Sequence, residues 1–306
     1  MKVAVTGATG LIGSAVTSSL AARGDQVVAL SRDASWAART LGDRVEVHSW
    51  ADPVGSPPPA AALTGTDAVI HLIGAPVAQR WTEQAKRSIW DSRVLSTRWL
   101  VSGLRELSDG RPAVLISGSA TGYYGPRHAE PLREDAAAGG DFLADLTTAW
   151  EREALGAVEL GMRVVRTRTG VVLARSGGAL AKMLPPFRLG VGGPVAGGAQ
   201  YVPWIHLDDV VGALLACLDD DAASGPVNVA APTPVSNAEF SKTLGRVLHR
   251  PAVLPVPAAA LRLLYGEMAS VVTTGQRAIP DRLEQLGYEF RFPRLEPALR
   301  DVLGRG

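Results

Sequence analysis

The sequence predicts an α/β fold, a Rossmann-type doubly wound parallel sheet with a smaller C-terminal α+β substrate lobe. Three observations lead to this prediction. A short β-branched strand at residues 2–6 enters a turn with glycines at positions 7, 10 and 13, and an apolar stripe at helical spacing follows directly. Further apolar segments alternate with helical ones, as in parallel sheets that helices cover on both faces. The 306 residues are enough to bury such a sheet and a second lobe.

The first turn has the form of a phosphate cradle for a dinucleotide. Gly7 permits the tight turn, Gly10 lets the backbone approach a pyrophosphate, and Gly13 lets the helix pack closely on the sheet. The start of the following helix supplies free backbone N–H groups and a partial positive charge. Because the pattern follows the first strand directly, it favours a nucleotide site over an ordinary connection between strand and helix.

The remaining elements are placed by their apolar patterns. We expect further strands at residues 26–30, 44–48, 67–73, 112–117, 163–168 and 227–230. We expect helices at residues 82–107, 143–160 and 207–218. The stripe that the first of these helices buries consists of Ala85, Ile89, Val94, Leu100 and Leu104.

A change of pattern after residue 173 predicts two parts. Residues 1–173 with about 205–231 form the expected cofactor-binding domain, and about 174–204 with 232–306 form the expected substrate lobe. Within the lobe, glycine and proline are frequent in residues 177–203, which predicts an irregular wall beside a cleft. From about residue 232 onward we expect helices and short strands, ending in residues 288–292.

Composition excludes several classes of function. Lys and Arg number 31 and Asp and Glu number 30, so no general field attracts nucleic acid or an anionic membrane. The single cysteine, Cys217, lies in an apolar run, which predicts a buried thiol. The five histidines lack the spacing of metal ligands, and no apolar run reaches the roughly 20 residues of a membrane span. A strand and a glycine turn stand where a signal peptide would have its apolar region, so we expect a cytoplasmic protein. As a separate expectation, the protein is a monomer or homodimer with a small-molecule substrate.

The end of the second strand indicates which dinucleotide is bound. An acidic residue there binds the ribose hydroxyls of NAD and repels the 2′-phosphate of NADP. This chain has Ser31 and Arg32, a hydroxyl and a planar guanidinium that suit a 2′-phosphate, although Asp33 follows them. The sequence therefore favours NADP(H).

Short distinctive segments continue along the chain. They lie at residues 71–74 (His-Leu-Ile-Gly), 81–83 (Trp-Thr-Glu), 91–93 (Asp-Ser-Arg), 117–125 (Ser-Gly-Ser-Ala-Thr-Gly-Tyr-Tyr-Gly), 150–151 (Trp-Glu), 168–173 (Arg-Thr-Gly-Val-Val-Leu), 186–194 and 204–209 (Trp-Ile-His-Leu-Asp-Asp). Together with the glycine turn they resemble the extended short-chain dehydrogenase/reductases. More narrowly, they resemble the atypical branch called the epimerase family, or nucleoside-diphosphate-sugar epimerases, and residues 251–303 resemble that branch's C-terminal domain of unknown function.

The resemblance implies a set of contacts with the cofactor. The expected residues are Gly7, Thr9, Gly10, Leu11, Ile12, Gly13, Ser31, Arg32, Leu72, Ile73, Gly74 and Val172. Arg93 is a further candidate, because it is expected to project from the long helix toward the cleft and to pair with a phosphate.

The catalytic residues of classical relatives are mostly missing. Ser119 matches the serine that orients the substrate oxygen, but Arg93 stands where those relatives have asparagine. The register of their Tyr-x-x-x-Lys pair, in which tyrosine is the acid and base, holds Leu143 and Thr147. No tyrosine or lysine occurs between Gly125 and Gly161.

Two hypotheses remain open. In the first, the protein is an oxidoreductase or epimerase, and Tyr123 or Tyr124, beside Arg93 and with a lowered pKa, handles the proton. His206 is another candidate base, although we expect it to anchor its loop to the helix that begins near Asp208. In the second, NADP is bound without efficient turnover, and the protein regulates or holds a partner.

The expected substrate side is apolar. Relatives that bind sugar nucleotides usually grip the diphosphate with an arginine, and the corresponding stretch here has the neutral Gln200. The candidate wall consists of Met183, Phe187, Gln200, Tyr201 and Trp204. Its composition fits a flat or hydrophobic small molecule with a carbonyl group at least as well as a sugar nucleotide.

Overall fold

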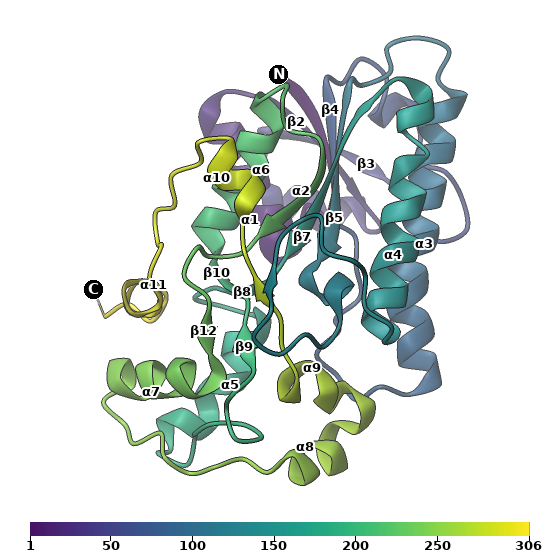
Figure 1. The fold of residues 1–306 in the computed structure, drawn as a ribbon. Coiled ribbons are helices and arrows are strands. Elements are labelled where there is room, and N and C mark those ends of the chain that lie inside the picture. Colours follow the sequence, from purple (N-terminus) through teal and green to yellow (C-terminus); the bar gives the residue numbers. More distant parts are fainter. Residues whose placement is uncertain (306) are drawn as a thin grey trace.

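A seven-stranded parallel sheet lies at the centre of residues 1–305, the part of the chain that the computed structural model describes (Figure 1). Its strands are β1 (Lys2–Thr6), β2 (Gln26–Ser31), β3 (Val45–Ser49), β4 (Ala68–His71), β5 (Val114–Ala120), β7 (Arg163–Thr169) and β11 (Gly225–Val229). The order across the sheet is β3-β2-β1-β4-β5-β7-β11. Winding therefore reverses between β1 and β4, and ligands of such sheets bind outside the carboxyl ends of the strands at that point.

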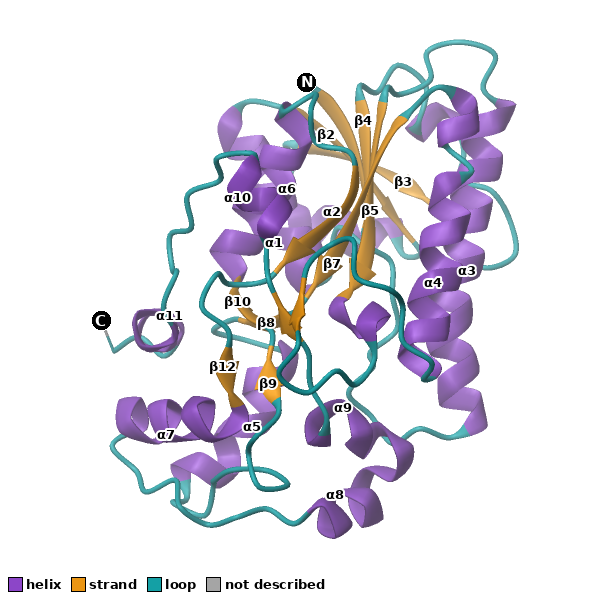
Figure 2. Cartoon of the chain, in the orientation of Figure 1, coloured by secondary structure: helices purple, strands orange, loops and turns teal. Residues whose placement is uncertain are grey.

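Helices cover both faces of this sheet (Figure 2). Because side chains alternate along a strand, Val3 and Val5 of β1 face one side, where α1 (Leu11–Arg23) and α6 (Leu207–Asp219) pack. Ala4 faces the other side, where α3 (Glu83–Glu106) packs beside α4 (Phe142–Leu155). A further helix, α2 (Ala34–Leu41), connects β2 to β3. The two-layer covering confirms the predicted doubly wound sheet.

The C-terminal lobe lies beyond the carboxyl edge of the sheet, in the lower part of Figure 1. Its helices are α5 (Gly178–Arg188), α7 (Asn237–Leu248), α8 (Ala258–Tyr265), α9 (Ala269–Thr273) and α11 (Leu295–Val302), and α10 (Asp281–Gln285) packs back on β11. Three short ladders pair β8 (Val171–Leu173) with β10 (Trp204–His206), β9 (Tyr201–Val202) with β12 (Val235–Ser236), and β6 (Pro131–Leu132) with β13 (Arg277–Ala278). A separate hydrophobic core around Trp204 and Phe240 stabilises the lobe.

Most predicted elements of the sheet domain are found within a few residues of their expected positions. The helix predicted at residues 82–107 is α3, and Thr82 caps it by accepting a hydrogen bond from the Ala85 N–H at 3.1 Å. The helix predicted at 143–160 ends earlier, at Leu155, and a short 3₁₀ turn at Val158–Leu160 follows it.

The irregular segment predicted at residues 177–203 is wrong in its first half, which forms α5 with Pro185 and Pro186 inside it. Proline interrupts the hydrogen-bond ladder of a helix. Here Leu180, Leu184 and Phe187 compensate, since their helical spacing buries all three in the core of the lobe.

The end of the chain also differs from the prediction. Residues 288–292 form no strand and are held as a loop by the buried Asp209 of α6. Its carboxylate accepts hydrogen bonds from the backbone N–H groups of Arg291 at 2.7 Å and Phe292 at 2.9 Å, and from the hydroxyl of Tyr288 at 3.1 Å. The chain then closes with α11.

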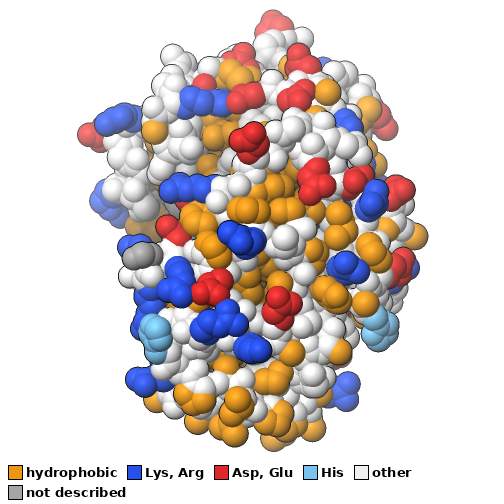
Figure 3. Space-filling view, turned by 60° about the vertical axis from the view of Figure 1, so that its left-hand side comes forward, with side chains coloured by type: hydrophobic (Ala, Val, Ile, Leu, Met, Phe, Trp, Pro, Cys, Tyr) orange, Lys and Arg blue, Asp and Glu red, His pale blue; other side chains and the backbone are white. Residues whose placement is uncertain are grey.

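Exposed hydrophobic side chains gather along the lower edge of the space-filling view, over the end of the molecule that includes α8 (Figure 3). Leu263 and Leu264 of α8 are 79% and 62% exposed, and Val253 in the preceding loop is 75% exposed. No helix in residues 1–305 is both long enough and apolar enough to cross a bilayer.

Candidate functional site

The glycine turn is closed so tightly that it leaves no space for side chains. Gly7 has a φ of +66°, and the Gly10 N–H donates to its carbonyl oxygen at 2.9 Å. A Cβ atom at Gly7 would lie 2.8 Å from the Leu72 carbonyl oxygen, and one at Gly13 would overlap the Gly7 carbonyl oxygen. Gly10 caps α1 without a side-chain hydrogen bond, so the N–H groups of the first turn stay available. This cradle fits a pyrophosphate.

A second pair of glycines, which the sequence reasoning missed, lies beside the cradle. A Cβ atom at Gly178 would lie 3.3 Å from a methyl carbon of Leu11 and 3.4 Å from the carbonyl oxygen of Val172. The start of α5 therefore joins Leu11 to Val172, both predicted cofactor contacts. The available signal was the Gly177-Gly178 pair, which begins four residues after the end of β8.

At the end of β2, the carboxylate of Asp33 is engaged elsewhere. It caps α2 by accepting a hydrogen bond from the Trp36 N–H at 2.8 Å. The Ser31 hydroxyl donates to the Asp33 carbonyl oxygen at 3.1 Å, and Arg32 is exposed. The acidic group next to the predicted 2′-phosphate site is thus used for helix capping.

His71 connects three elements behind the cradle. Its Nδ1 lies 2.7 Å from the hydroxyl oxygen of Thr6 in β1, and its Nε2 lies 3.2 Å from that of Ser96 in α3. Burial lowers the pKa of His71 to about 3, so the ring is neutral. Thr6 in turn accepts a hydrogen bond from the Leu72 N–H at 3.2 Å, which fixes the start of the segment predicted to lie along the cofactor.

Arg93 has a half-buried guanidinium with few hydrogen-bond partners. Its Nη1 donates to the Ile89 carbonyl oxygen at 3.1 Å, and the guanidinium carbon lies 5.5 Å from the centroid of the Trp150 ring. A Cβ atom at Gly74 would lie 2.8 Å from its Nη2. No acidic side chain of residues 1–305 offsets the desolvation, which lowers the pKa of Arg93 to about 10. Such a group favours a bound anion.

Ser119 belongs to a buried ionic cluster. Its hydroxyl donates to Oε1 of Glu151 in α4 at 2.7 Å. Two guanidinium groups bind the same carboxylate: Arg168 donates to both of its oxygens, at 2.8 Å and 3.0 Å, and Arg166 donates to Oε2 at 3.0 Å. Glu151 and Arg168 both lie in segments that carry the family resemblance, but the sequence did not predict that they bind one another.

The two tyrosines differ in their surroundings. Tyr124 is fully buried, and its hydroxyl donates to Oδ1 of Asn228 at 2.7 Å and accepts from Nη1 of Arg168 at 3.0 Å. Burial raises the pKa of Tyr124 to about 12, so the expected lowering of its pKa by Arg93 is wrong. Tyr123 is half-buried, and the guanidinium carbon of Arg168 lies 3.4 Å from its ring centroid. The arginine beside both tyrosines is Arg168.

Leu143 and Thr147, at the positions of the missing Tyr-x-x-x-Lys pair, have structural contacts. A Cβ atom at Gly122 would lie 3.1 Å from Cβ of Leu143, so Leu143 lies against the turn after β5. Thr147 donates its hydroxyl to the Leu143 carbonyl oxygen at 2.7 Å. His206, as expected, anchors α6: its Nδ1 accepts from the Asp208 N–H at 3.0 Å.

The predicted substrate wall is largely part of a core. Trp204 is 1% exposed and Phe187 4% exposed, and both pack inside the C-terminal lobe. Gln200 donates to the carbonyl oxygens of Val195 at 3.0 Å and Val272 at 2.9 Å, which fastens two loops together. All three side chains contribute to the packing of the lobe, which disfavours a cleft-lining role, and the substrate wall stays a prediction. Met183 and Tyr201 are half-buried.

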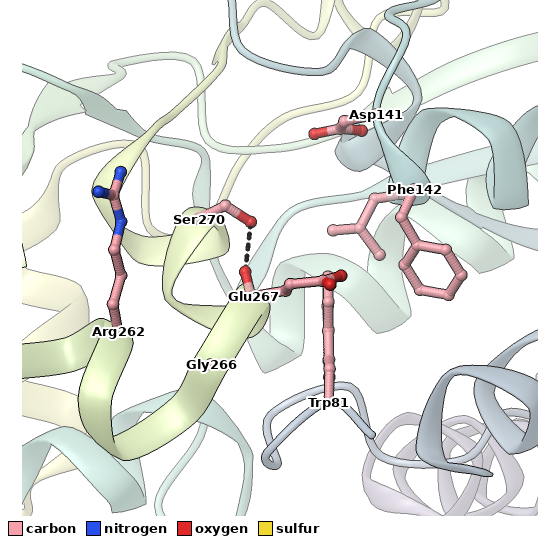
Figure 4. Close-up of a pocket in the computed structure, with 8 residues that line it drawn as sticks. Trp81, Asp141, Phe142, Arg262, Gly266, Glu267 and Ser270 are labelled. Carbon is pink, nitrogen blue, oxygen red and sulfur yellow. Dashed lines mark hydrogen bonds between the residues drawn. The ribbon is translucent and has the colours of Figure 1, made fainter. Parts of the chain in front are cut away.

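A pocket of about 440 Å³ lies instead between α4 and the C-terminal lobe (Figure 4). The sheet domain contributes Trp81, Asp141, Phe142 and Leu143. The lobe contributes Arg262, Gly266, Glu267 and Ser270, from α8, the 3₁₀ turn η4 (Gly266–Met268) and α9. Leu143 thus lines this pocket and also packs against the turn after β5. Within residues 1–305, no group of three or more His, Cys, Asp and Glu side chains is arranged to hold a metal ion.

Two family models match the chain. The model described as NAD dependent epimerase/dehydratase family matches residues 3–230, and that of a domain of unknown function, DUF1731, matches residues 256–302. An epimerase family protein of Mycobacterium bovis is 41% identical over 97% of this chain and 96% of its own length. The human epimerase family protein SDR39U1 is 36% identical over 99% of this chain and 100% of its own length.

A solved structure supports the same relationship. The crystal structure of human epimerase family protein SDR39U1 (isoform 2) with NADPH has a TM-score of 0.86 and 33% sequence identity, with 99% of each chain covered. These matches confirm the resemblance drawn from the sequence motifs. The chain belongs to the NAD dependent epimerase/dehydratase family and has a DUF1731 region at its C-terminal end.

Proposed function

We propose that this protein binds NADP(H) and acts as an oxidoreductase or epimerase on a carbonyl or alcohol carbon of a small molecule or sugar nucleotide. The observation that carries the proposal is the closed glycine cradle at the carboxyl end of β1. Next to it, at the end of β2, the Asp33 carboxylate is occupied in capping α2. The NADPH in the crystal structure of human SDR39U1 supports the same cofactor.

The chain offers a group for each part of NADP(H). The first turn of α1, including Gly10, Leu11 and Ile12, receives the pyrophosphate on its N–H groups. Ser31 and Arg32 receive the 2′-phosphate, since a guanidinium fork suits a phosphate dianion. Arg93 provides a further cation for a phosphate. The proposed contacts are completed by Gly7, Thr9, Gly13, Leu72, Ile73, Gly74 and Val172.

When bound, the nicotinamide supplies hydride transfer, and the chain positions the substrate. Ser119 lies at the end of β5 with its proton donated to Glu151, so its oxygen is free to accept a hydrogen bond from a substrate hydroxyl. Tyr123 is the proposed proton donor among the two tyrosines, because Tyr124 is closed in by Asn228 and Arg168.

A second candidate function is an NADP(H)-binding regulatory or interaction protein with little turnover. The observation that favours it is the occupation of the acid/base register by Leu143 and Thr147. Neither side chain transfers a proton near neutral pH.

The absorbance of NADPH, followed with a broad panel of small carbonyl compounds, distinguishes the two functions. An oxidoreductase oxidises NADPH with at least one member, and Ser119→Ala lowers that rate by about tenfold or more. Ser18→Ala, at an exposed position of α1 away from the cradle, is the matched control. Tight NADPH binding without oxidation of any compound would contradict the enzymatic proposal and favour the regulatory one.

A further inference from the structure

The end of β5 offers few protons to a substrate. A serine hydroxyl has one proton, and that of Ser119 is donated at 2.7 Å to a carboxylate held by two guanidinium groups. The hydroxyl of Tyr124 is buried and hydrogen-bonded to Asn228. Tyr123, the proposed donor, is therefore the one tyrosine left there, and it lacks the lysine that accompanies the tyrosine of classical relatives. Reduction of an isolated ketone gives an alkoxide, which is about as basic as hydroxide, the conjugate base of water with a pKa of about 15.7. Such a substrate needs a strong proton donor.

The pocket beside Leu143 has the composition of a site for an apolar ring. The rings of Trp81 and Phe142 meet edge to face, with centroids 5.1 Å apart, and form one side together with Leu143. Its volume of about 440 Å³ is in the usual range for a small organic ligand. Leu143 also lies against Gly122 in the turn after β5, so this one side chain links the pocket to the end of the strand that carries Ser119.

The charges around the pocket disfavour a sugar diphosphate. The lining contains two carboxylates, Asp141 and Glu267, and one guanidinium, Arg262. Asp141 caps α4 by accepting from the Ala144 N–H, and the exposed Glu267 pairs with Lys86 at 3.0 Å. A diphosphate would approach these two carboxylates, and Arg262 is the single cation of the lining, since Lys86 is already paired with Glu267.

We propose that this pocket binds a quinone or a similarly conjugated dicarbonyl compound, which the protein reduces with NADPH. The proposal rests on the NADP(H)-dependent function above and specifies its substrate class. The quinone takes up a hydride with its electron pair from the reduced nicotinamide, which is oxidised, and becomes a hydroquinone monoanion. That anion then takes one proton from the Tyr123 hydroxyl or from water. Since its oxygen is phenolic, with a pKa near the value of about 10 for tyrosine, no strong acid from the protein is required.

A chain that has lost the tyrosine and lysine pair is thus suited to this substrate class. The hydride acceptor stabilises the negative charge itself, and Leu143 in the former acid/base register becomes an apolar contact for the ring. The same replacement would slow the reduction of an isolated ketone, because general acid catalysis raises the rate of such a step by about 100-fold or more.

The test uses the full chain with duroquinone, whose substituted ring does not add thiols, and acetophenone as an isolated ketone of similar size. Binding of duroquinone without NADPH is measured by titration calorimetry. Ser270→Phe fills the pocket from its exposed rim in α9, and Val271→Phe adds the same ring at the next residue, outside the lining. We expect Ser270→Phe to weaken binding by about tenfold or more and Val271→Phe to change it less than about twofold.

NADPH oxidation then completes the test. We expect kcat/KM for duroquinone to exceed that for acetophenone by about 100-fold or more. Equal binding by Ser270→Phe and the unsubstituted protein would overturn the pocket assignment. Reduction of acetophenone at the rate of duroquinone would overturn the substrate class and leave the oxidoreductase function intact. If the protein binds NADPH but reduces neither compound nor any other carbonyl, both the substrate class and the oxidoreductase function would be overturned.

Discussion

At the scale of single residues, the buried hydroxyl of Tyr124 joins β11 to β7 through Asn228 and Arg168. Removing it in Tyr124→Phe leaves a buried amide oxygen and a guanidinium N–H without their partner. We expect the free energy of unfolding to fall by about 1–3 kcal/mol, measured by urea denaturation. Tyr123→Phe, at the half-buried neighbour, is the control and should cost less than about 1 kcal/mol. An unchanged stability together with lost turnover would instead identify Tyr124 as the proton donor.

His71 makes the stability of the fold depend on pH. The pKa of the His71 imidazole is about 3 in the folded state and 6.5 in the unfolded chain. Between these two pH values the unfolded state therefore binds more protons than the folded state. The stabilisation is complete above pH 6.5 and is lost as the pH falls toward 3, with a slope of up to about 1.4 kcal/mol per pH unit.

The difference between unsubstituted protein and His71→Asn, followed by urea denaturation from pH 7 to pH 4, isolates this contribution from the carboxylates. We expect the variant to lose stability less steeply as the pH falls. His249→Asn is a matched control, because His249 is exposed and its left-handed backbone accepts asparagine. The same slope in the unsubstituted protein and in His71→Asn would contradict the assignment.

At the scale of elements, the N-terminus of α2 decides how the end of β2 is used. Asp33→Ala removes the carboxylate that accepts from the Trp36 N–H, and we expect a loss of about 1 kcal/mol in unfolding free energy. Because that carboxylate is engaged in capping, NADH affinity should stay within about twofold, measured by fluorescence titration. A loss of NADH affinity of about tenfold or more would show that Asp33 binds the ribose.

Elements with a regular apolar period were predictable, and those stabilised by distant partners were less so. The strand, turn and helix around Gly7 and Gly13 follow from local rules: Gly7 takes a positive φ in the turn, and a Cβ atom at Gly13 would overlap the Gly7 carbonyl oxygen. In α5 the prolines obscured a stripe whose burial depends on the lobe core. Residues 288–292 read as a strand, but the carboxylate that holds them as a loop, Asp209, lies far away in the sequence.

At the scale of the whole molecule, the family and the cofactor cradle were predictable, and the pocket was not. The cradle lies within one continuous stretch of chain. The pocket needs Trp81, the start of α4 and the α8–α9 region at once, and only the packing of the lobe on the sheet domain brings them together. The sequence likewise placed Trp204 and Gln200 in the wall of a cleft, whereas the packing of the lobe buries both side chains. The predicted boundaries between the two domains stay a prediction.

The central claim is that the whole fold presents an NADP(H) site. Dissociation constants for NADPH and NADH, measured by titration calorimetry on the unsubstituted protein, on Arg32→Asp and on the exposed control Arg39→Asp, test it most directly. We predict that the unsubstituted protein and Arg39→Asp bind NADPH at least about tenfold more tightly than NADH, and that Arg32→Asp loses this preference while its NADH affinity is retained. Equal affinity for the two cofactors in the unsubstituted protein, or equal losses for both in Arg32→Asp, would contradict the account.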